Sequence, residues 1–318
     1  MSTVEPAIGW GKILTLLTVL AVANVWFKPF ENRETPPATA TRINSVTEPL
    51  VRRTPGWTPF AAATVTPGIQ TLTGRAQCTT NFVFTDAGGN VYLGQAAHCA
   101  SASDDEINGC RARSKPLGTR VTFNLHGTKY DAGKQLAKGR LAYSSWHTMR
   151  RIGETDPNAC RFNDFALIKV DARDRKLVNP TMPHWGGPEG LSEGGLYILD
   201  RAYGFGRSSL RRDNSPASRQ AAQTMADQPE TEGWAHVIIA PSPGIPGDSG
   251  SGYVDEHGQA LGTLSTLSIG SVLYNVLGDL MRELEYARRH SGISDLRLEL
   301  GTVPFDQERA EAAEVLAQ

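Results

Sequence analysis

The sequence contains little cysteine, little excess charge and no repeated unit, and each shortage excludes a class of protein. Its four cysteines in 318 residues form no C-x-x-C pair, which argues against a zinc ribbon or a thioredoxin-type site. The formal net charge is -1, without a long block of Lys or Arg, so nothing in the sequence suggests binding to nucleic acid. No fixed period repeats along the chain, which argues against a solenoid or a propeller.

Signals for metals and cofactors are missing as well. Six of the seven histidines show no metal-ligand spacing, and they are His126, His147, His184, His236, His257 and His290. The acidic segment 101–109 lacks the alternating ligand pattern of an EF-hand. We therefore expect no metal and no cofactor.

Long apolar runs are absent except at the N-terminus. Residues 13–27 are uncharged and follow Lys12, and the run contains Ala21-Val22-Ala23, an A-x-A pattern typical of signal-peptidase cleavage. We favour a signal peptide over residues 1–27. The alternative is an uncleaved membrane anchor, because residues 7–27 approach the length that spans a bilayer. Either reading predicts that the rest of the chain lies outside the cytoplasm.

The next segment, residues 28–68, is rich in Pro, Thr and Arg without a sustained period. This composition is typical of a linker or a short pro-segment. We expect a single folded domain over residues 69–292, followed by a C-terminal extension over residues 293–318.

Short β-rich runs separated by turn residues fill the expected domain. They cover residues 79–94, 119–125, 164–170, 195–200, 234–240, 252–266 and 271–276. Many short strands at this spacing predict antiparallel barrels or sandwiches. A helical period appears only near the end, where Leu277, Leu280, Met281 and Leu284 recur at i, i+3, i+4 and i+7.

A nucleophile is indicated by "GDSGSG", in which Ser249 and Asp248 lie between glycines. A serine hydroxyl needs a base to accept its proton, and histidine is the usual base. His98 in "AAHC" is the candidate, because it ends a β-rich run directly before Cys99. The base in turn needs a buried carboxylate, and Asp164 in "NDFALIKV" opens a strongly apolar strand.

These three segments, in this order and at spacings of 66 and 85 residues, resemble the signature segments of the chymotrypsin-like (trypsin-fold) serine proteases. The "GDSGS" form is similar to the bacterial, streptogrisin-like branch. The resemblance covers roughly residues 70–290. It implies an all-β fold of two antiparallel six-stranded β-barrels with a C-terminal α-helix.

The same resemblance implies roles for the residues around Ser249. The N–H groups of Gly247 and Ser249 would form the oxyanion hole. Asp248 would point into the protein and pair with an internal arginine, for which Arg201 is our candidate; the alternative is that Arg201 is a solvated residue at a strand end. In "LGTLST", Ser265 would hydrogen-bond the triad carboxylate, and with Thr266 it would pair with the substrate backbone.

The resemblance also implies the disulfide pairing and the substrate specificity. The resemblance implies a histidine-loop disulfide Cys78–Cys99, which leaves Cys110 for Cys160; a local Cys99–Cys110 bridge is the alternative. Pro243 lies where trypsin-like members carry a pocket carboxylate, and Val272 lies where roomy pockets have glycine. We therefore expect cleavage after small or medium apolar residues, because a basic side chain would be buried without a partner.

The functional prediction is an exported, monomeric serine endopeptidase that acts on proteins or peptides through Ser249, His98 and Asp164. It is secreted, or anchored through residues 7–27. Two alternatives remain open: an inactive or weakly active protein that uses the same fold to bind a partner, and an esterase that uses the same triad.

Overall fold

The computed structural model describes residues 56–102, 106–128, 130–193, 197–211, 215–225, 229–269 and 273–315. The expected signal or anchor segment, most of the expected linker and Val272 lie outside these ranges. No helix within them is both long enough and apolar enough to cross a membrane.

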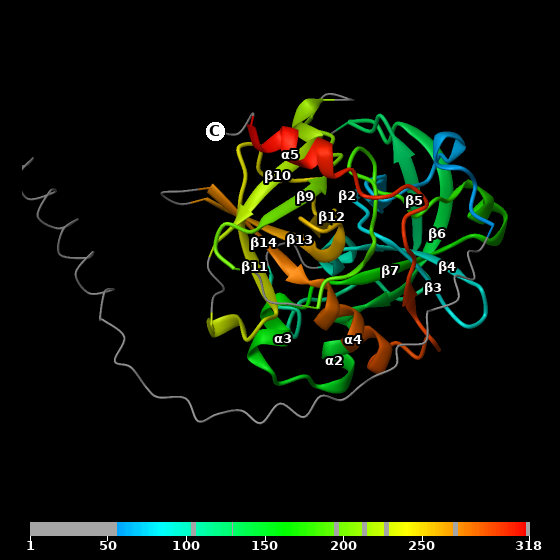
Figure 1. Ribbon diagram of the computed structural model, residues 1–318. Coiled ribbons are helices and arrows are strands. Elements are labelled where there is room, and N and C mark those ends of the chain that lie inside the picture. Colours follow the sequence, from blue (N-terminus) through cyan, green and yellow to red (C-terminus); the bar gives the residue numbers. More distant parts are fainter. Residues whose placement is uncertain are drawn as a thin grey trace, which may run out of the picture. The chain divides into compact units, whose positions relative to one another are not determined.

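The described residues contain fifteen strands, which form two sheets (Figure 1). The first sheet has the order β15-β3-β4-β7-β6-β5-β1-β2. Its strands are β1 (Gln70–Thr73), β2 (Ala76–Thr79), β3 (Val83–Thr85), β4 (Val91–Gln95), β5 (Arg120–Leu125), β6 (Lys134–Ser144), β7 (Ala166–Val170) and β15 (Arg297–Leu298).

This sheet closes into a barrel because β2 and β3 are two parts of one bent segment. β2 pairs with β1, and β3 pairs with β4, so the segment 76–85 joins the two ends of the sheet. Between them, the N–H of Thr80 donates to the carbonyl of Ile69, and that of Asn81 donates to Gly94. Counted in this way, the barrel has six antiparallel strands, with β15 added at β3.

The second sheet is a closed six-stranded barrel in its own right. The order β12-β9-β10-β11-β14-β13 is completed by a pairing of β12 with β13, and the short β8 adds to β13 in parallel. Its strands are β8 (Gly190–Leu191), β9 (Arg201–Phe205), β10 (Arg219–Thr224), β11 (Ala235–Ile239), β12 (Gly252–Asp255), β13 (Gln259–Ile269) and β14 (Leu273–Asp279). The predicted pair of six-stranded antiparallel barrels is therefore confirmed.

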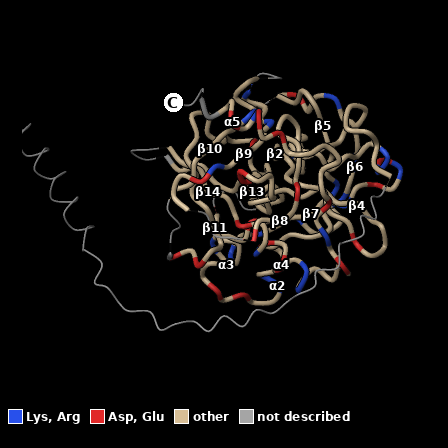
Figure 2. The backbone as a smooth tube through the Cα atoms, in the orientation of Figure 1, with Lys and Arg blue, Asp and Glu red and all other residues tan. Residues whose placement is uncertain are grey.

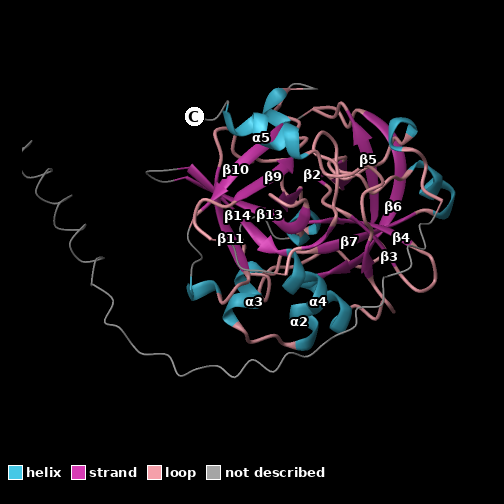
Figure 3. Cartoon of the chain, viewed as in Figure 1, coloured by secondary structure: helices cyan, strands magenta, loops and turns pink. Residues whose placement is uncertain are grey.

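Few helices accompany the barrels in the part of the chain that the structure describes. The α-helices are α2 (Ser145–Ile152), α3 (Pro157–Phe162), α4 (Leu280–His290) and α5 (Gln307–Val315), and the 3-10 helices are η1 (Phe60–Ala62), η2 (Ala97–Ala100), η3 (Ala172–Leu177), η4 (Pro216–Ser218) and η5 (Pro229–Thr231). Figure 3 shows α2, α3 and α4 at one end of the strands and α5 at the other. Helix α4 begins where the Asp279 carboxylate accepts the N–H of Arg282, an N-cap that satisfies one free donor of the first turn.

Alternating apolar residues of the strands fill the barrel interiors. Val83, Leu93, Val121, Phe123 and Ile168 form the core of the first barrel, and all five are fully buried. Figure 2 shows residues of both charges scattered along the described chain, without a block of one sign. The apolar interior and mixed exterior are those of a barrel packed with side chains rather than a pore.

The segments that flank the barrels are packed more closely than the composition indicated. Val65, in the expected linker, is fully buried, and its N–H donates to the carbonyl of Leu177. In the C-terminal extension, β15 pairs with β3, and Ala310 of α5 is fully buried in a core cluster.

Two local expectations need correction. Strand β9 begins at Arg201, whereas the expected strand covered 195–200; of that range, Tyr197, Ile198 and Leu199 are exposed by 79%, 63% and 62%. Their apolar side chains belong to a turn, in which Leu199 has φ of +73°. Leu277 belongs to β14 and not to the helix, because Asp279 caps α4 two residues later.

Candidate active site

His98 and Asp164 come together where η2 meets the start of β7. The His98 Nδ1 lies 2.6 Å from Asp164 Oδ2, and the His98 backbone N–H donates to Asp164 Oδ1 at 2.8 Å. The Ala97 N–H donates in turn to the Asp164 carbonyl. Because an ionised carboxylate can only accept, Nδ1 carries a hydrogen and Nε2 of a neutral ring keeps its lone pair for another partner.

Asp164 is 3% exposed and is held by two further groups. The Ser265 hydroxyl of β13 donates to Asp164 Oδ2 at 2.6 Å, as predicted for this residue. The Asp164 backbone N–H donates to Glu283 Oε1 of α4 at 3.0 Å. Glu283 was not predicted, and it is itself fully buried. A hydrogen-bonded carboxylate of this kind has little freedom to turn away from the histidine.

The two members of the pair shift each other's pKa values. Burial alone would lower the pKa of His98, but the charge and hydrogen bond of Asp164 outweigh it and raise that pKa above 6.5. Burial opposes ionisation of Asp164, yet its hydrogen bonds and the His98 charge lower its pKa below 3.8. Asp164 is therefore ionised at neutral pH, which is the state that stabilises a protonated imidazole.

The turn that carries Ser249 packs directly against the segment that carries His98. The Thr79 N–H of β2 donates to the Ser249 carbonyl at 2.9 Å. Gly250 has φ of +87°, and a Cβ there would lie 2.6 Å from the backbone nitrogen of Ala96. Only glycine allows the turn to approach so closely. Among the described residues, the Ser249 hydroxyl forms no hydrogen bond with His98, and such catalytic bonds are often long until substrate binds.

The N–H groups of Gly247 and Ser249 donate to no other group in the described ranges. Gly247 has φ of +98°, a conformation that only glycine adopts without strain. Its carbonyl accepts the Thr79 hydroxyl at 2.8 Å and Gln77 Nε2 at 3.1 Å. Two amides without an acceptor among the described residues, separated by Asp248, are therefore available as donors, and the oxyanion hole stays a prediction.

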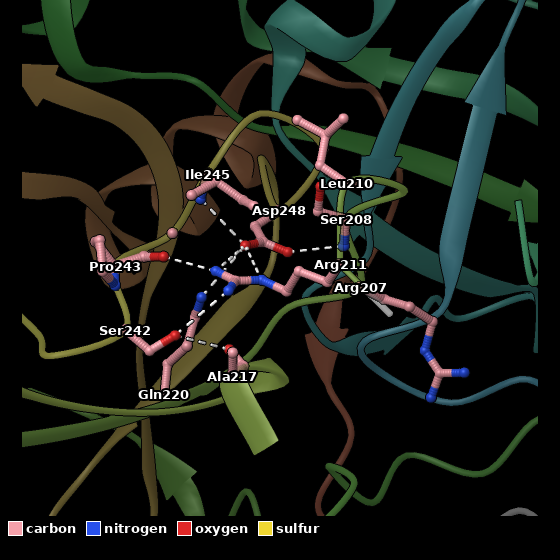
Figure 4. Close-up of polar contacts among 12 residues, drawn as sticks. Arg207, Ser208, Leu210, Arg211, Ala217, Gln220, Ser242, Pro243, Ile245 and Asp248 are labelled. Carbon is pink, nitrogen blue, oxygen red and sulfur yellow. Dashed lines mark hydrogen bonds and ion pairs between the residues drawn. The ribbon is translucent and has the colours of Figure 1, made fainter. Parts of the chain in front are cut away.

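Asp248 is fully buried, and its cationic partner is Arg211 rather than Arg201. Arg211 Nη2 lies 2.7 Å and Nε 3.0 Å from Asp248 Oδ2 (Figure 4). The N–H of Ser208 donates to the other oxygen at 2.8 Å. The predicted partner, Arg201, is therefore wrong, whereas the inward direction predicted for Asp248 agrees with its burial.

The path of β9 explains why Arg201 is too far away. Arg201 begins the strand and pairs in register with Gln223 of β10. A Cβ on Gly206, just beyond the other end, would lie 2.4 Å from Asp248 Oδ1. Five strand residues span roughly 17 Å, so the loop after β9 faces Asp248, and that loop carries Arg211.

The structure describes one of the two expected pocket residues, Pro243. The Pro243 carbonyl accepts Arg211 Nη2 at 2.6 Å. Behind it, the Asn275 amide is 1% exposed, exchanges hydrogen bonds with both backbone groups of Gly244 and donates to the Thr266 carbonyl. Val272 lies outside the described residues, so its place at the wall stays a prediction. The sequence pattern did not single out Asn275, which ties Gly244 to the carbonyl of Thr266 in β13.

Both expected disulfides are present. Cys78–Cys99 joins β2 to η2, so it ties the His98 segment to the strand whose Thr79 holds Ser249. Cys110–Cys160 joins the 106–115 loop to α3, which ends two residues before Asp164. The local Cys99–Cys110 alternative is therefore wrong.

Comparison with known proteins gives similarity at the level of structure. No protein-family model and no curated protein matches the chain. Solved structures similar to it are bacterial proteases. Thermobifida fusca protease A is 14% identical with a TM-score of 0.46, over 74% of this chain and 100% of that chain. Nocardiopsis protease is 16% identical with a TM-score of 0.44, over 74% and 98%. Cellulomonas bogoriensis chymotrypsin is 17% identical with a TM-score of 0.42, over 74% and 98%.

Proposed function

We propose that the chain is an exported serine endopeptidase that cleaves proteins or peptides through Ser249, His98 and Asp164. The observation that carries this proposal is the His98–Asp164 pair, buttressed by Ser265, next to a glycine-bounded turn that carries Ser249. Its two disulfides favour an oxidising compartment outside the cytoplasm. We expect the protein to act as a monomer without a cofactor.

In the proposed reaction, Ser249 Oγ attacks the peptide carbonyl carbon while His98 Nε2 accepts the hydroxyl proton. The carbonyl oxygen becomes an oxyanion that the Gly247 and Ser249 N–H groups stabilise. His98 then gives its proton to the amine as the C–N bond breaks, which leaves an acyl-enzyme. A water molecule attacks this ester with His98 as base, and the acid product leaves with Ser249 restored.

Asp164 holds the Nδ1–H tautomer of His98 and stabilises the imidazolium that forms in each step. Its lowered pKa and the Ser265 hydrogen bond support this role, because a protonated Asp164 would have no charge to offer. Asp248 and Arg211 would hold the turn in shape from behind.

Two rival functions remain: a binding protein on an inactive protease fold, and an esterase. The test is hydrolysis of an unfolded protein and of a simple ester by the wild type, Ser249→Ala, His98→Ala and the double variant. We expect both substrates to be cleaved, each single variant to lose nearly all turnover, and the double to be scarcely worse, because the residues act as a unit. Strictly additive losses would mean that the roles are wrong. Ester cleavage without protein cleavage would favour the esterase.

A further inference from the structure

The Ser208 hydroxyl is buried beside the proposed oxyanion hole, but it touches neither Ser249 nor His98. Ser208 is 3% exposed, and its Oγ donates to the Pro246 carbonyl at 2.6 Å. The same Oγ accepts the Leu210 N–H at 3.0 Å. Ser208 therefore links the loop after β9 to the turn that carries the nucleophile. Figure 4 shows a second bond between the same two segments, from the Ser208 N–H to Asp248.

The Pro246 carbonyl and the Gly247 N–H belong to one peptide group. A trans peptide is planar, so its C=O and N–H point in opposite directions. A hydrogen bond that fixes the Pro246 oxygen on the Ser208 side therefore directs the Gly247 N–H to the other side. That N–H has no acceptor among the described residues, and it is one of the two donors of the proposed oxyanion hole.

This peptide has the freedom to turn over. Gly247 has φ of +98°, and glycine populates positive and negative φ about equally. Proline at 246 fixes its own φ but leaves ψ, the bond that turns this peptide, unrestricted. A reversed peptide would present a carbonyl oxygen to the developing negative charge in place of a donor.

The next peptide along the chain is held separately. The Gly247 carbonyl is bound by Thr79 and Gln77 of β2, and these bonds leave the preceding peptide without restraint. In the described part of the chain, the Ser208 hydroxyl is the one group that donates to the Pro246 oxygen.

We propose that Ser208 is a positioning residue for the oxyanion hole, which locks the Pro246–Gly247 peptide with its N–H toward the substrate carbonyl. This inference rests on the proposed function, because it assigns Ser208 a part in the same reaction. Ser208 does not touch the reacting atoms; it acts through the orientation of Gly247.

The experiment compares Ser208→Ala with wild type in peptide hydrolysis and in binding of a peptidyl trifluoromethyl ketone. That inhibitor forms a tetrahedral adduct with the nucleophilic serine and places an oxyanion in the hole, whereas the matching non-electrophilic peptide amide does not. Loss of an oxyanion donor typically costs ~10²–10³ in rate. We expect kcat to fall by at least about tenfold and by no more than the ~10³ that complete loss of the donor would cost. The affinity for the ketone should fall by a similar factor. KM and amide affinity should stay within about twofold.

Two controls separate positioning from general damage. Ser208→Thr and Ser208→Val have the same shape and differ in the hydroxyl, so Thr should retain most of kcat and Val should resemble Ala, even if Ala itself folds poorly. Ser209→Ala, a change at the neighbouring serine, should leave kcat unchanged. Equal kcat and ketone affinity for Thr and Val would overturn the proposal. If the wild type is inactive, the proposed function fails instead, and the two failures remain distinct.

Discussion

The backbone N–H of Asp164 donates to Oε1 of Glu283 at 3.0 Å, so a fully buried carboxyl from α4 lies directly behind the acid of the proposed triad. Burial raises the pKa of Glu283 well above 4.5. A hydrogen bond from Thr263 lowers that pKa, but the negative charge of Asp164 raises it further. The raised pKa favours the neutral form of Glu283 in the folded protein, and that form avoids a second negative charge beside Asp164.

This arrangement predicts a stability that falls with pH. In the unfolded chain Glu283 ionises near 4.5, whereas the raised pKa lets the folded chain keep the proton to higher pH. Stability then declines as pH rises above that value, by at most about 1.4 kcal/mol per pH unit for one group. Glu283→Gln mimics the neutral acid, so its stability relative to wild type should increase from pH 4.5 to 7.5 in urea unfolding. Glu285→Gln, at an exposed position of the same helix, is the control. A constant difference across this range would refute the neutral state.

A second prediction concerns the pH dependence of activity. Catalysis needs neutral His98, and Asp164 raises the pKa of His98 above 6.5. Activity should therefore be lost as pH falls through a midpoint above 6.5 in a profile of kcat/KM. Asp164→Asn removes the charge and favours the wrong tautomer, so kcat should fall by ~10⁴, and the residual activity should lack that midpoint. A wild-type midpoint well below 6.5 would contradict the pairing.

The third prediction concerns Arg211. Arg211→Met would leave Asp248 buried without a cation, which typically costs about 3–5 kcal/mol. Arg201→Met tests the partner that the sequence suggested, and it should change the free energy of unfolding far less. Adding Asp248→Asn to Arg211→Met should restore part of the lost stability, because the unpaired charge is gone. Equal losses for the two arginine variants would argue against the pairing with Arg211.

The motifs predicted the triad and its order, because His98, Asp164 and Ser249 each lie in a short segment whose local sequence reports its role. Strand and turn signals are local, and they predicted antiparallel barrels or sandwiches; the two six-stranded barrels were implied by the resemblance that the motifs carry. Residues that contact these motifs from distant segments could not be predicted from local sequence. The cation for Asp248 depends on the path of the loop after β9, and Glu283 reads as an ordinary polar residue of an amphipathic helix. Asn275 contacts Gly244 from β14, and its position depends on the register of β14 against β13.

A fourth prediction concerns specificity. By the resemblance, Pro243 lies where trypsin-like members carry the pocket acid, and its carbonyl accepts a hydrogen bond from the Arg211 guanidinium. A Lys or Arg side chain would find no free carboxylate at that position, because Asp248 is already paired with Arg211, so we expect cleavage after Ala, Val or Leu. Profiling with a peptide library measures this preference. Clear selection of Arg or Lys at the cleaved bond would reject this pocket and leave the triad untouched.

The central claim is that Ser249 is a nucleophile activated by His98. Treatment of the folded protein with a serine-directed peptidyl phosphonate, followed by peptide mapping, tests it most directly. The account predicts that the label is confined to the peptide that contains Ser249, is absent in Ser249→Ala and forms at least about a hundredfold more slowly in His98→Ala. Folded wild-type protein that takes up no label, or takes it up elsewhere in the chain, would contradict the account.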